Sequence, residues 1–371
     1  MDNILINLLF RIKSNNQSIL QGNASLAILI CDLSSECDHN NIDEVSYMLC
    51  KSINSNIEKY SNCTLGNGLL GGLYAIGYLK KKGKINLEDD FFCEYDKFAL
   101  LFAKNCLKNG NYDLYYGLLG VGLYYLILSE IDSKYEQKLD WIVQKIVDLS
   151  VEVNGNIYWR RMHDGGGLIF DWGLLHGIPS IISFLLIVYH TNPHFLKYES
   201  CIRKALKTMS DNMNVSTKNF SYFHMTGINL KYNFEFESRL GYCYGDLGVI
   251  NTYLLASRYL NDKTYMTYAE QMINKLLFRI ENYKEEVYNL NFCHGVSGIL
   301  ELLLKFNQYI EINEISSSIV RMRAEIENHL KGLDYEKFVP DLLDGDIGIL
   351  FSYLSSSGYD LPGIERLLLI K

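Results

Sequence analysis

The sequence predicts an all-α protein of the α/α toroid class, with about seven inner and seven outer helices and short β-hairpin inserts. Two observations lead to this prediction. A glycine-punctuated motif recurs along the chain, and strongly apolar segments alternate with amphipathic ones. The 4 prolines in 371 residues suit long helices. No linker or low-complexity segment interrupts the pattern, so we expect a single domain over residues 1–371.

The recurring motif is Gly-x-x-Gly followed by a nearly unbroken run of apolar residues. Its first glycines lie 46 to 68 residues apart, which is the range of helical-pair repeats. Five complete copies begin at Gly68, Gly117, Gly245, Gly295 and Gly345, and two degenerate copies occupy residues 22–25 and 177–180.

Amphipathic helical patterns lie between the motif copies, at residues 89–107, 139–146, 200–213, 265–280 and 315–326. In them apolar residues recur at intervals of three and four. A helix that is apolar all round must be buried, and an amphipathic helix can cover it from outside. Two closed rings of helices satisfy both conditions. An open solenoid is the alternative, and it would need polar capping repeats at its ends.

The two longest intervals between motif copies contain strand-like segments. Residues 151–160 surround Asn154 and Gly155, a pair typical of hairpin turns. Residues 228–237 alternate apolar and polar side chains with the period of a strand. We expect both segments to be short hairpins that decorate the helices.

The composition argues against some classes of function. The formal net charge is −8 and no basic block occurs, so nucleic acid is not an expected partner. Apolar runs such as residues 118–128 are shorter than the roughly 20 residues that span a bilayer. Nine cysteines without an amino-terminal signal peptide indicate reduced thiols in the cytoplasm.

Residues with reactive side chains precede several of the glycine motifs. In a toroid the loops before all inner helices would meet at one end of the axis. These positions hold Asp113, His176, Cys243, Cys293 and His294.

Cys243, Cys293 and His294 would form a three-ligand zinc site that leaves one coordination position open, as catalytic zinc sites do. Thiolate and imidazole are suitable zinc ligands. The alternative is a pair of buried cysteines beside a histidine that caps a helix, since the chain lacks a Cys-x-x-Cys pair at this place.

The motifs SRLGYCYGDLG, NFCHGVSG and LLHGIPS, preceded by YDLYYGLLG, resemble those of the lanthionine synthetase C-like family, the LanC cyclases of lanthipeptide biosynthesis. The resemblance extends over nearly the whole chain, to LLDGDIG at residues 342–348. It implies an α/α toroid with a zinc ion at its axis, and the family's zinc ligands map onto Cys243, Cys293 and His294.

The resemblance also implies four catalytic residues. The family's catalytic histidine maps onto His176, and its aspartate at the second complete glycine-rich repeat maps onto Asp113. An active-site arginine maps onto Arg239, and the tyrosine after the first zinc cysteine onto Tyr244. The chain departs from the family pattern at Tyr242, where tryptophan is usual, and at Ser180, where glycine is usual.

The implied reaction is an intramolecular Michael addition, in which a cysteine thiol of a dehydrated precursor peptide adds to dehydroalanine or dehydrobutyrine. Zinc would favour the thiolate. His176 would donate a proton to the α-carbon of the enolate, Asp113 would orient His176, and Arg239 would stabilise the enolate oxygen. A separate dehydratase is an expected partner, as is an export transporter, through which the cytoplasmic enzyme would lie peripheral to the membrane.

Other interpretations remain open. His176 could simply be a hydrogen-bonding residue at a helix N-terminus, Asp113 could cap its helix, and Arg239 could pair with Asp246. A different zinc-dependent alkylation of thiols, such as prenyl transfer, would also use an α/α ring. A zinc-stabilised scaffold that binds thiols or peptides would need no proton donor.

Overall fold

The computed structural model describes residues 18–34, 47, 49–52, 62–88, 90–162, 168–214, 220–228, 238–334 and 337–371. The chain forms two compact units. Unit 1 comprises Met1–Ile146 and Gly332–Leu367, and unit 2 comprises Val147–Lys331 and Leu368–Lys371. The single domain expected over residues 1–371 stays a prediction.

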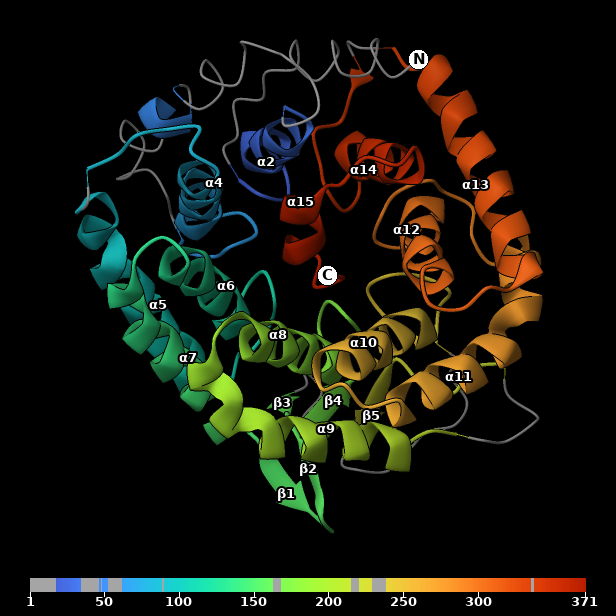
Figure 1. The fold of residues 1–371 in the computed structure, drawn as a ribbon, viewed down its shortest axis with the longest axis horizontal. Coiled ribbons are helices and arrows are strands. Elements are labelled where there is room, and N and C mark those ends of the chain that lie inside the picture. The colour runs from blue at the N-terminus through green and yellow to red at the C-terminus, as the bar shows by residue number, and fades with distance from the viewer. Residues whose placement is uncertain are drawn as a thin grey trace. The chain divides into compact units, whose positions relative to one another are not determined.

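Four apolar helices of unit 1 begin directly after the first glycine of a motif copy. They are α2 (Asn23–Leu33), α4 (Leu69–Lys81), α6 (Leu118–Ser129) and α14 (Asp346–Ser356). Helix α4 packs against α2 and α6, and α2 also packs against α14 (Figure 1). Nearly every residue of these helices is buried, as their unbroken apolar sequences require.

The remaining helices of unit 1 are amphipathic or short. Helices α5 (Asp96–Lys108) and α7 (Glu136–Asp148) bury one stripe each, and α5 packs on α6. Single turns of 3-10 helix, η2 (Phe91–Tyr95) and η3 (Ser133–Tyr135), precede them. Helix α15 (Pro362–Leu367) packs against α2.

A buried carboxyl group joins three helices of unit 1. Asp32 in α2 accepts a hydrogen bond from the Tyr78 hydroxyl of α4 at 2.5 Å and from the Gly363 amide of α15 at 2.9 Å. Lys82 lies 3.8 Å away. Burial raises the pKa of Asp32 to about 6, because the low-dielectric interior disfavours the charged form.

Unit 2 repeats the two-layer arrangement. Its apolar helices α8 (Ile178–Thr191), α10 (Asp246–Tyr259) and α12 (Val296–Asn307) pack in sequence order. Amphipathic helices α9 (Glu199–Asp211), α11 (Thr264–Glu281) and α13 (Asn313–Lys331) cover them, each on the preceding apolar helix (Figure 1). The 3-10 turns η4 (Pro193–Tyr198) and η5 (Tyr283–Glu285) complete the helical part of unit 2 that the structure describes. The amphipathic segments predicted from residues 200–213, 265–280 and 315–326 are confirmed.

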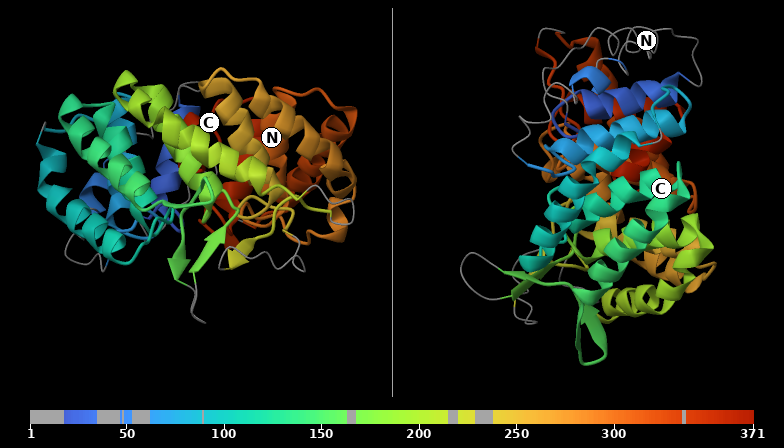
Figure 2. Two further views of the ribbon diagram at one scale, coloured as in Figure 1. Left: turned by 90° about the horizontal axis from the view of Figure 1, so that it is seen from below. Right: turned by 90° about the vertical axis from the view of Figure 1, so that its left-hand side faces the viewer.

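The strands of unit 2 are short. Strands β1 (Val151–Val153) and β2 (Asn156–Tyr158) pair antiparallel, with Val151 opposite Tyr158. Asn154 and Gly155 have φ angles of 52° and 79°, as a primed hairpin turn requires. The predicted hairpin is therefore confirmed, and Figure 2 shows it projecting beyond the helices of its unit.

A second sheet contains three strands in the order β3 (Arg161–Met162), β4 (Leu168–Asp171) and β5 (Thr226–Ile228). Both pairings are antiparallel. Of the strand-like segment predicted at residues 228–237, Ile228 ends β5, and residues 229–237 lie outside the described residues.

Each motif copy provides a tight turn followed by a helix start. The second glycine matters because the helix presses on the carbonyl groups of its own turn. A Cβ atom on Gly298 would lie 2.0 Å from the carbonyl oxygen of Phe292. In unit 1 the turns are also linked to one another by backbone hydrogen bonds. These run from the Leu20 amide to Gly66 O at 3.1 Å, from the Gly66 amide to Tyr115 O at 2.9 Å, and from the Leu342 amide to Leu20 O at 2.8 Å.

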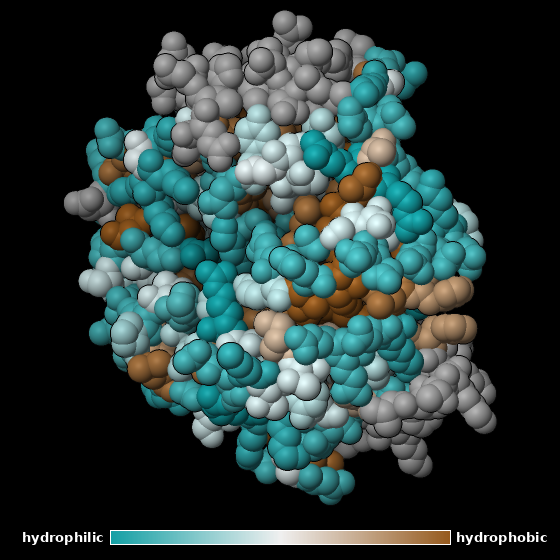
Figure 3. Space-filling view, turned by 45° about the vertical axis from the view of Figure 1, so that its right-hand side comes forward, coloured by the Kyte–Doolittle hydropathy of each residue, from teal (hydrophilic) through white to brown (hydrophobic). Residues whose placement is uncertain are grey.

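Hydrophilic residues dominate the face shown in Figure 3, with a smaller hydrophobic area among them. Within the described ranges, no helix combines the length and the hydropathy that a membrane span needs.

Candidate functional site

Backbone hydrogen bonds join the turns before α8, α10 and α12. The amide of Gly245 donates to the Trp172 carbonyl at 3.0 Å, and the amide of Leu175 donates to the Cys243 carbonyl at 3.4 Å. The amides of Tyr242 and Cys243 both donate to the Cys293 carbonyl, at 3.2 and 3.3 Å. The three turns that carry His176, Cys243 and Cys293 are thus fixed side by side.

Gly173 explains how closely two of these turns approach. A Cβ atom at this position would lie 2.1 Å from the carbonyl oxygen of Cys243, so only glycine fits. The turn that carries His176 therefore lies directly against the turn that carries Cys243.

Cys243, Cys293 and His294 form a cluster whose ligand atoms all lie within 4.8 Å of one another. Both cysteines are buried, and His294 is half-buried. The Cys293 Sγ atom lies 3.7 Å from His294 Nε2. A turn before a helix thus directs two consecutive side chains to one point, which a regular helix could not do.

The geometry fits a tetrahedral metal site. Zinc–sulfur and zinc–nitrogen bonds of ordinary length place neighbouring ligand atoms roughly 3.6 Å apart, close to the distance between Cys293 Sγ and His294 Nε2. Two sulfur atoms and one imidazole suit zinc better than calcium or magnesium. Three ligands leave a fourth position for another group.

Electrostatics favours the thiolate at Cys243. Its pKa lies well below the usual thiol value, because Cys243 accepts hydrogen bonds from Cys293 and His294 and because positive charge on His294 and His176 stabilises the anion. Burial opposes this shift and is outweighed. A deprotonated thiol is the form that binds a metal.

His176 and Tyr244 lie next to the cluster of Cys243, Cys293 and His294. Their ring centroids are 5.5 Å apart and the planes are tilted by 36°. Each of the two side chains is half-buried, whereas Cys243, next to Tyr244 in the same turn, is buried. Five sequence-predicted residues of unit 2 therefore lie near one another, with an imidazole and a phenol beside the sulfur atoms: His176, Cys243, Tyr244, Cys293 and His294.

Arg239 precedes Cys243 by four residues, and its side chain is exposed. The alternative pairing of Arg239 with Asp246 is not what the structure shows. The Asp246 carboxylate accepts hydrogen bonds from the amides of Tyr222 and Phe223, at 2.7 and 2.9 Å. Arg279, and not Arg239, is the arginine whose charge acts on Asp246.

Asp113 belongs to unit 1, in the turn before α6. One carboxylate oxygen accepts hydrogen bonds from the amides of Tyr115 and Tyr116, at 2.9 and 2.8 Å. Asp113 thus caps the turn, and not helix α6 itself as the alternative expected, because the N-cap of α6 is Gly117. Its role toward His176 stays a prediction.

Sequence reasoning missed Arg279. This residue occupies the apolar stripe of α11, between Leu276 and Ile280, and only 5% of it is exposed. An arginine on the buried stripe of an amphipathic helix is the signal that could have identified it.

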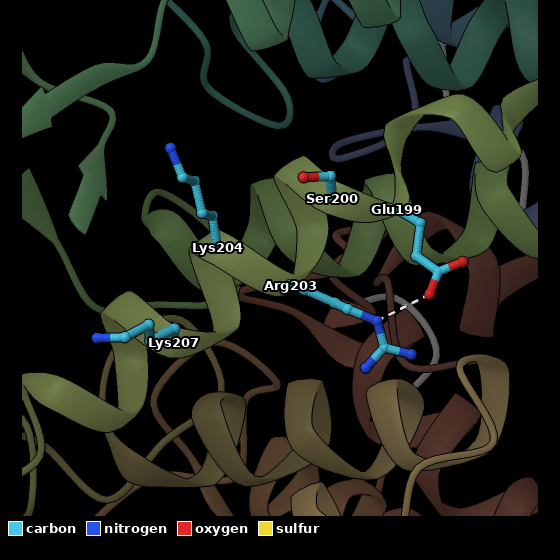
Figure 4. A pocket seen from close by; sticks show the side chains of 5 residues that line it. All are labelled: Glu199, Ser200, Arg203, Lys204 and Lys207. Atoms are coloured by element: carbon cyan, nitrogen blue, oxygen red, sulfur yellow. Dashed lines mark hydrogen bonds and ion pairs between the residues drawn. The ribbon is translucent and has the colours of Figure 1, made fainter. Parts of the chain in front are cut away.

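A surface hollow of about 550 Å³ lies along α9, lined by Glu199, Ser200, Arg203, Lys204 and Lys207 (Figure 4). None of the predicted site residues lines it. Its cations are paired with carboxylates, for example Arg203 with Glu199 at 2.8 Å, so it is an ordinary charged surface.

The fold and site define a class of protein: a two-layer helical-repeat protein whose turns hold a sulfur- and imidazole-rich cluster suited to a metal ion. The family model of lanthionine synthetase C-like proteins matches residues 13–355. The chain therefore belongs to the lanthionine synthetase C-like family.

Comparison with solved structures agrees with this membership. Nisin cyclase matches with a TM-score of 0.72 at 16% sequence identity, over 100% of this chain and 96% of that chain. This likeness confirms the predicted α/α toroid fold class. An inactive variant of an alpha-1,6-mannanase of Salegentibacter sp., in complex with alpha-1,6-mannotriose, matches with a TM-score of 0.45 at 11% identity, over 100% of this chain and 98% of that chain. No curated protein matches the sequence significantly.

Proposed function

We propose that this protein is a zinc-dependent lanthipeptide cyclase. It would add cysteine thiols of a dehydrated precursor peptide to dehydroalanine or dehydrobutyrine and form lanthionine or methyllanthionine rings. The main support for this proposal is the cluster of Cys243, Cys293 and His294, which lies beside the His176–Tyr244 pair in a member of the lanthionine synthetase C-like family.

The donor set fits zinc, and Cys243, Cys293 and His294 would hold it. Zinc, when bound, supplies a positive centre that lowers the pKa of a neighbouring thiol. Burial of Cys243 and Cys293 keeps water away from their sulfur atoms. The half-buried edge of the site, at His176, Tyr244 and His294, is the side open to a peptide.

The reaction balances without an external reagent. The substrate sulfur forms a bond to Cβ as the carbon–carbon double bond is consumed, and Cα gains the proton that the thiol gives up. His176 is the proposed donor to Cα, since histidine exchanges protons near neutral pH. Arg239 is proposed to stabilise the enolate oxygen, and Tyr244 to orient the His176 ring.

The reaction needs other proteins. We propose that a separate dehydratase supplies the dehydroalanine or dehydrobutyrine to which the thiol adds. We propose a cytoplasmic location, with peripheral association with the membrane through a complex with an export transporter. The eight cysteines of the described residues are all free, which supports a reducing compartment.

Counting thiols tests the proposal. Ring formation leaves the peptide mass unchanged and removes one free thiol per ring, so alkylation followed by mass spectrometry counts the rings. After incubation with the zinc-loaded protein, thiols of the dehydrated peptide should no longer react with the alkylating reagent. Every thiol of the undehydrated peptide should still react with it. Prenyl transfer would instead add mass. A binding scaffold would retain the peptide and leave every thiol free, which would contradict the proposal.

A further inference from the structure

The turn before α10, residues 238–245, differs from the turns of the other repeats. In four repeats the carbonyl six residues before the first motif glycine accepts a hydrogen bond from the amide that follows this glycine. The accepting residues are Asn62, Asn111, Asn289 and Val339, at distances from 2.8 to 3.3 Å. In residues 238–245 the residue six positions before the motif glycine is Arg239, and the amide of Gly245 itself donates to the carbonyl of Trp172, in the turn before α8, at 3.0 Å.

The backbone of this turn is unusual as well. Gly245 has a φ angle of 106°, whereas the corresponding glycines before α4, α6, α8, α12 and α14 have φ angles between −112° and −140°. Glycine adopts positive φ without the steric cost that other residues would have. The turn that carries Arg239 and Cys243 therefore has a backbone conformation of its own, which contacts from neighbouring elements support.

Arg279 supplies such a support from α11. Its Nη2 atom donates a hydrogen bond to the Ser238 carbonyl at 2.9 Å. The same guanidinium group donates two hydrogen bonds to Glu286, from Nε at 2.7 Å and from Nη2 at 2.5 Å. A planar guanidinium held by a carboxylate at two points has a fixed direction.

Hydrogen bonds with residues 221–223 also support the turn of residues 238–245. The Ser238 amide donates to the Ser221 hydroxyl at 3.2 Å. Asp246, directly after Gly245, accepts from the amides of Tyr222 and Phe223. Ser238, Asp246 and Arg279 are all at least 95% buried, so these bonds are shielded from water.

We propose that Arg279 is a positioning residue for the candidate active site: clamped by Glu286, it fixes the Ser238 carbonyl and thereby the conformation of residues 238–245, which present Arg239 and Cys243. The inference rests on the proposed function only in taking Cys243 as a metal ligand. Arg279 acts through the backbone and contacts neither substrate nor metal.

The test compares Arg279→Met with Arg279→Lys, Glu286→Gln and the control Arg321→Met. Arg321 also donates to a backbone carbonyl, that of Glu281 at 2.9 Å, but it lies on the exposed face of α13. Hydrogen exchange of residues 238–245 is measured on metal-free protein, and zinc affinity is measured by competition with a chelator. Neither measurement depends on cyclase turnover, so failure of the proposed function would not disturb this test.

Arg279→Met should raise the zinc dissociation constant about 10- to 100-fold, as loss of outer-shell support does, and should speed exchange in residues 238–245. With dehydrated peptide, kcat should fall more than KM changes. Arg279→Lys should restore part of the affinity. Glu286→Gln should weaken zinc binding about fivefold, and it keeps the test decisive if Arg279→Met does not fold. Arg321→Met should match the wild type. The proposal would be overturned if the hydrogen-exchange rates and the zinc affinity of Arg279→Met were within twofold of those of the wild type. Unchanged exchange rates and zinc affinity in Glu286→Gln would also overturn it.

Discussion

The turns before α12 and α14 have nearly the same backbone and carry different chemistry. In the first, Asn291 Oδ1 accepts a hydrogen bond from the His294 amide at 3.0 Å. In the second, Asp341 Oδ1 accepts from the amides of Leu343 and Asp344, both at 2.8 Å. The second and third residues after the capping residue, directly before the motif glycine, are Cys293 and His294 in one turn and Leu343 and Asp344 in the other.

Within these turns, the residues that hold the backbone differ from the residues that carry reactive side chains. A capping Asn or Asp fixes the turn in both units, and the two positions before the glycine are free to vary. Asp113 caps the turn before α6 in the same way as Asp341 caps its own. Capping alone therefore does not mark a catalytic residue, and matched substitutions in equivalent turns can distinguish the two roles.

The largest effect is expected at Cys293. Cys293→Ala should lose zinc and ring formation together, because catalytic zinc sites use three protein ligands and only two would remain. Leu343→Ala, in the equivalent position before α14, should lower thermal stability through the lost buried side chain and keep both zinc and activity. Bound zinc and free-thiol counts measure both. Full zinc content in Cys293→Ala would show that the metal lies elsewhere.

His176→Ala comes next. It should keep its zinc and slow ring closure by about 10²- to 10⁴-fold, the usual cost of losing a general acid–base group. Zinc content and single-turnover rates are the measurements. Loss of zinc as complete as in Cys293→Ala would make His176 a ligand or a structural support, and a wild-type rate would assign the proton donor to another group.

A smaller effect is expected when the turn caps lose their charge. Asp113→Asn and Asp341→Asn both keep an oxygen that can accept the two amide hydrogen bonds, so both should melt near the wild-type temperature. Asp113→Asn should slow ring closure about tenfold if its charge supports a protonated His176, whereas Asp341→Asn should not. Equal rates of ring closure in the two variants would show that Asp113 serves only to cap its turn.

At Asp32 we expect an effect on the pH dependence of stability and not on ring formation. Burial raises the pKa of Asp32 to about 6, so the folded state binds more protons than the unfolded state between about pH 4 and 6. The contribution of Asp32 to stability is thus present in acid and is lost as the pH rises through about 6. In Asp32→Asn, the change in the free energy of unfolding between about pH 4 and 6 should be smaller by up to about 3 kcal/mol. Denaturant melts at pH 4 to 7 measure it, and an unchanged slope would contradict the assignment.

The sequence was sufficient to predict the helices and the grouping of Cys243, Cys293 and His294. Unbroken apolar runs after Gly68, Gly117 and Gly295 leave only a buried helix as a solution, and the structure has one at each place. Cys243, Cys293 and His294 could be grouped in advance because each lies one or two residues before the first glycine of a motif copy.

Other features depend on contacts that periodicity does not encode. The hydrogen bond from Arg279 to Ser238 joins positions 41 residues apart, and its existence depends on the loop conformation that Gly245 adopts. Asp113 had the residue type for either capping or catalysis, and only the hydrogen bonds to Tyr115 and Tyr116 show that it caps.

The hydrogen bond between the Leu342 amide and the Leu20 carbonyl has a consequence for the order of folding. It joins the two segments of unit 1 across the whole of Val147–Lys331, so unit 1 must close a very long loop. The three cluster residues lie within residues 243–294, a far shorter loop that can form earlier. During synthesis, Gly332–Leu367 of unit 1 and Leu368–Lys371 of unit 2 leave the ribosome after all three of these residues, and the proposed metal cluster can therefore assemble before either unit has its C-terminal segment.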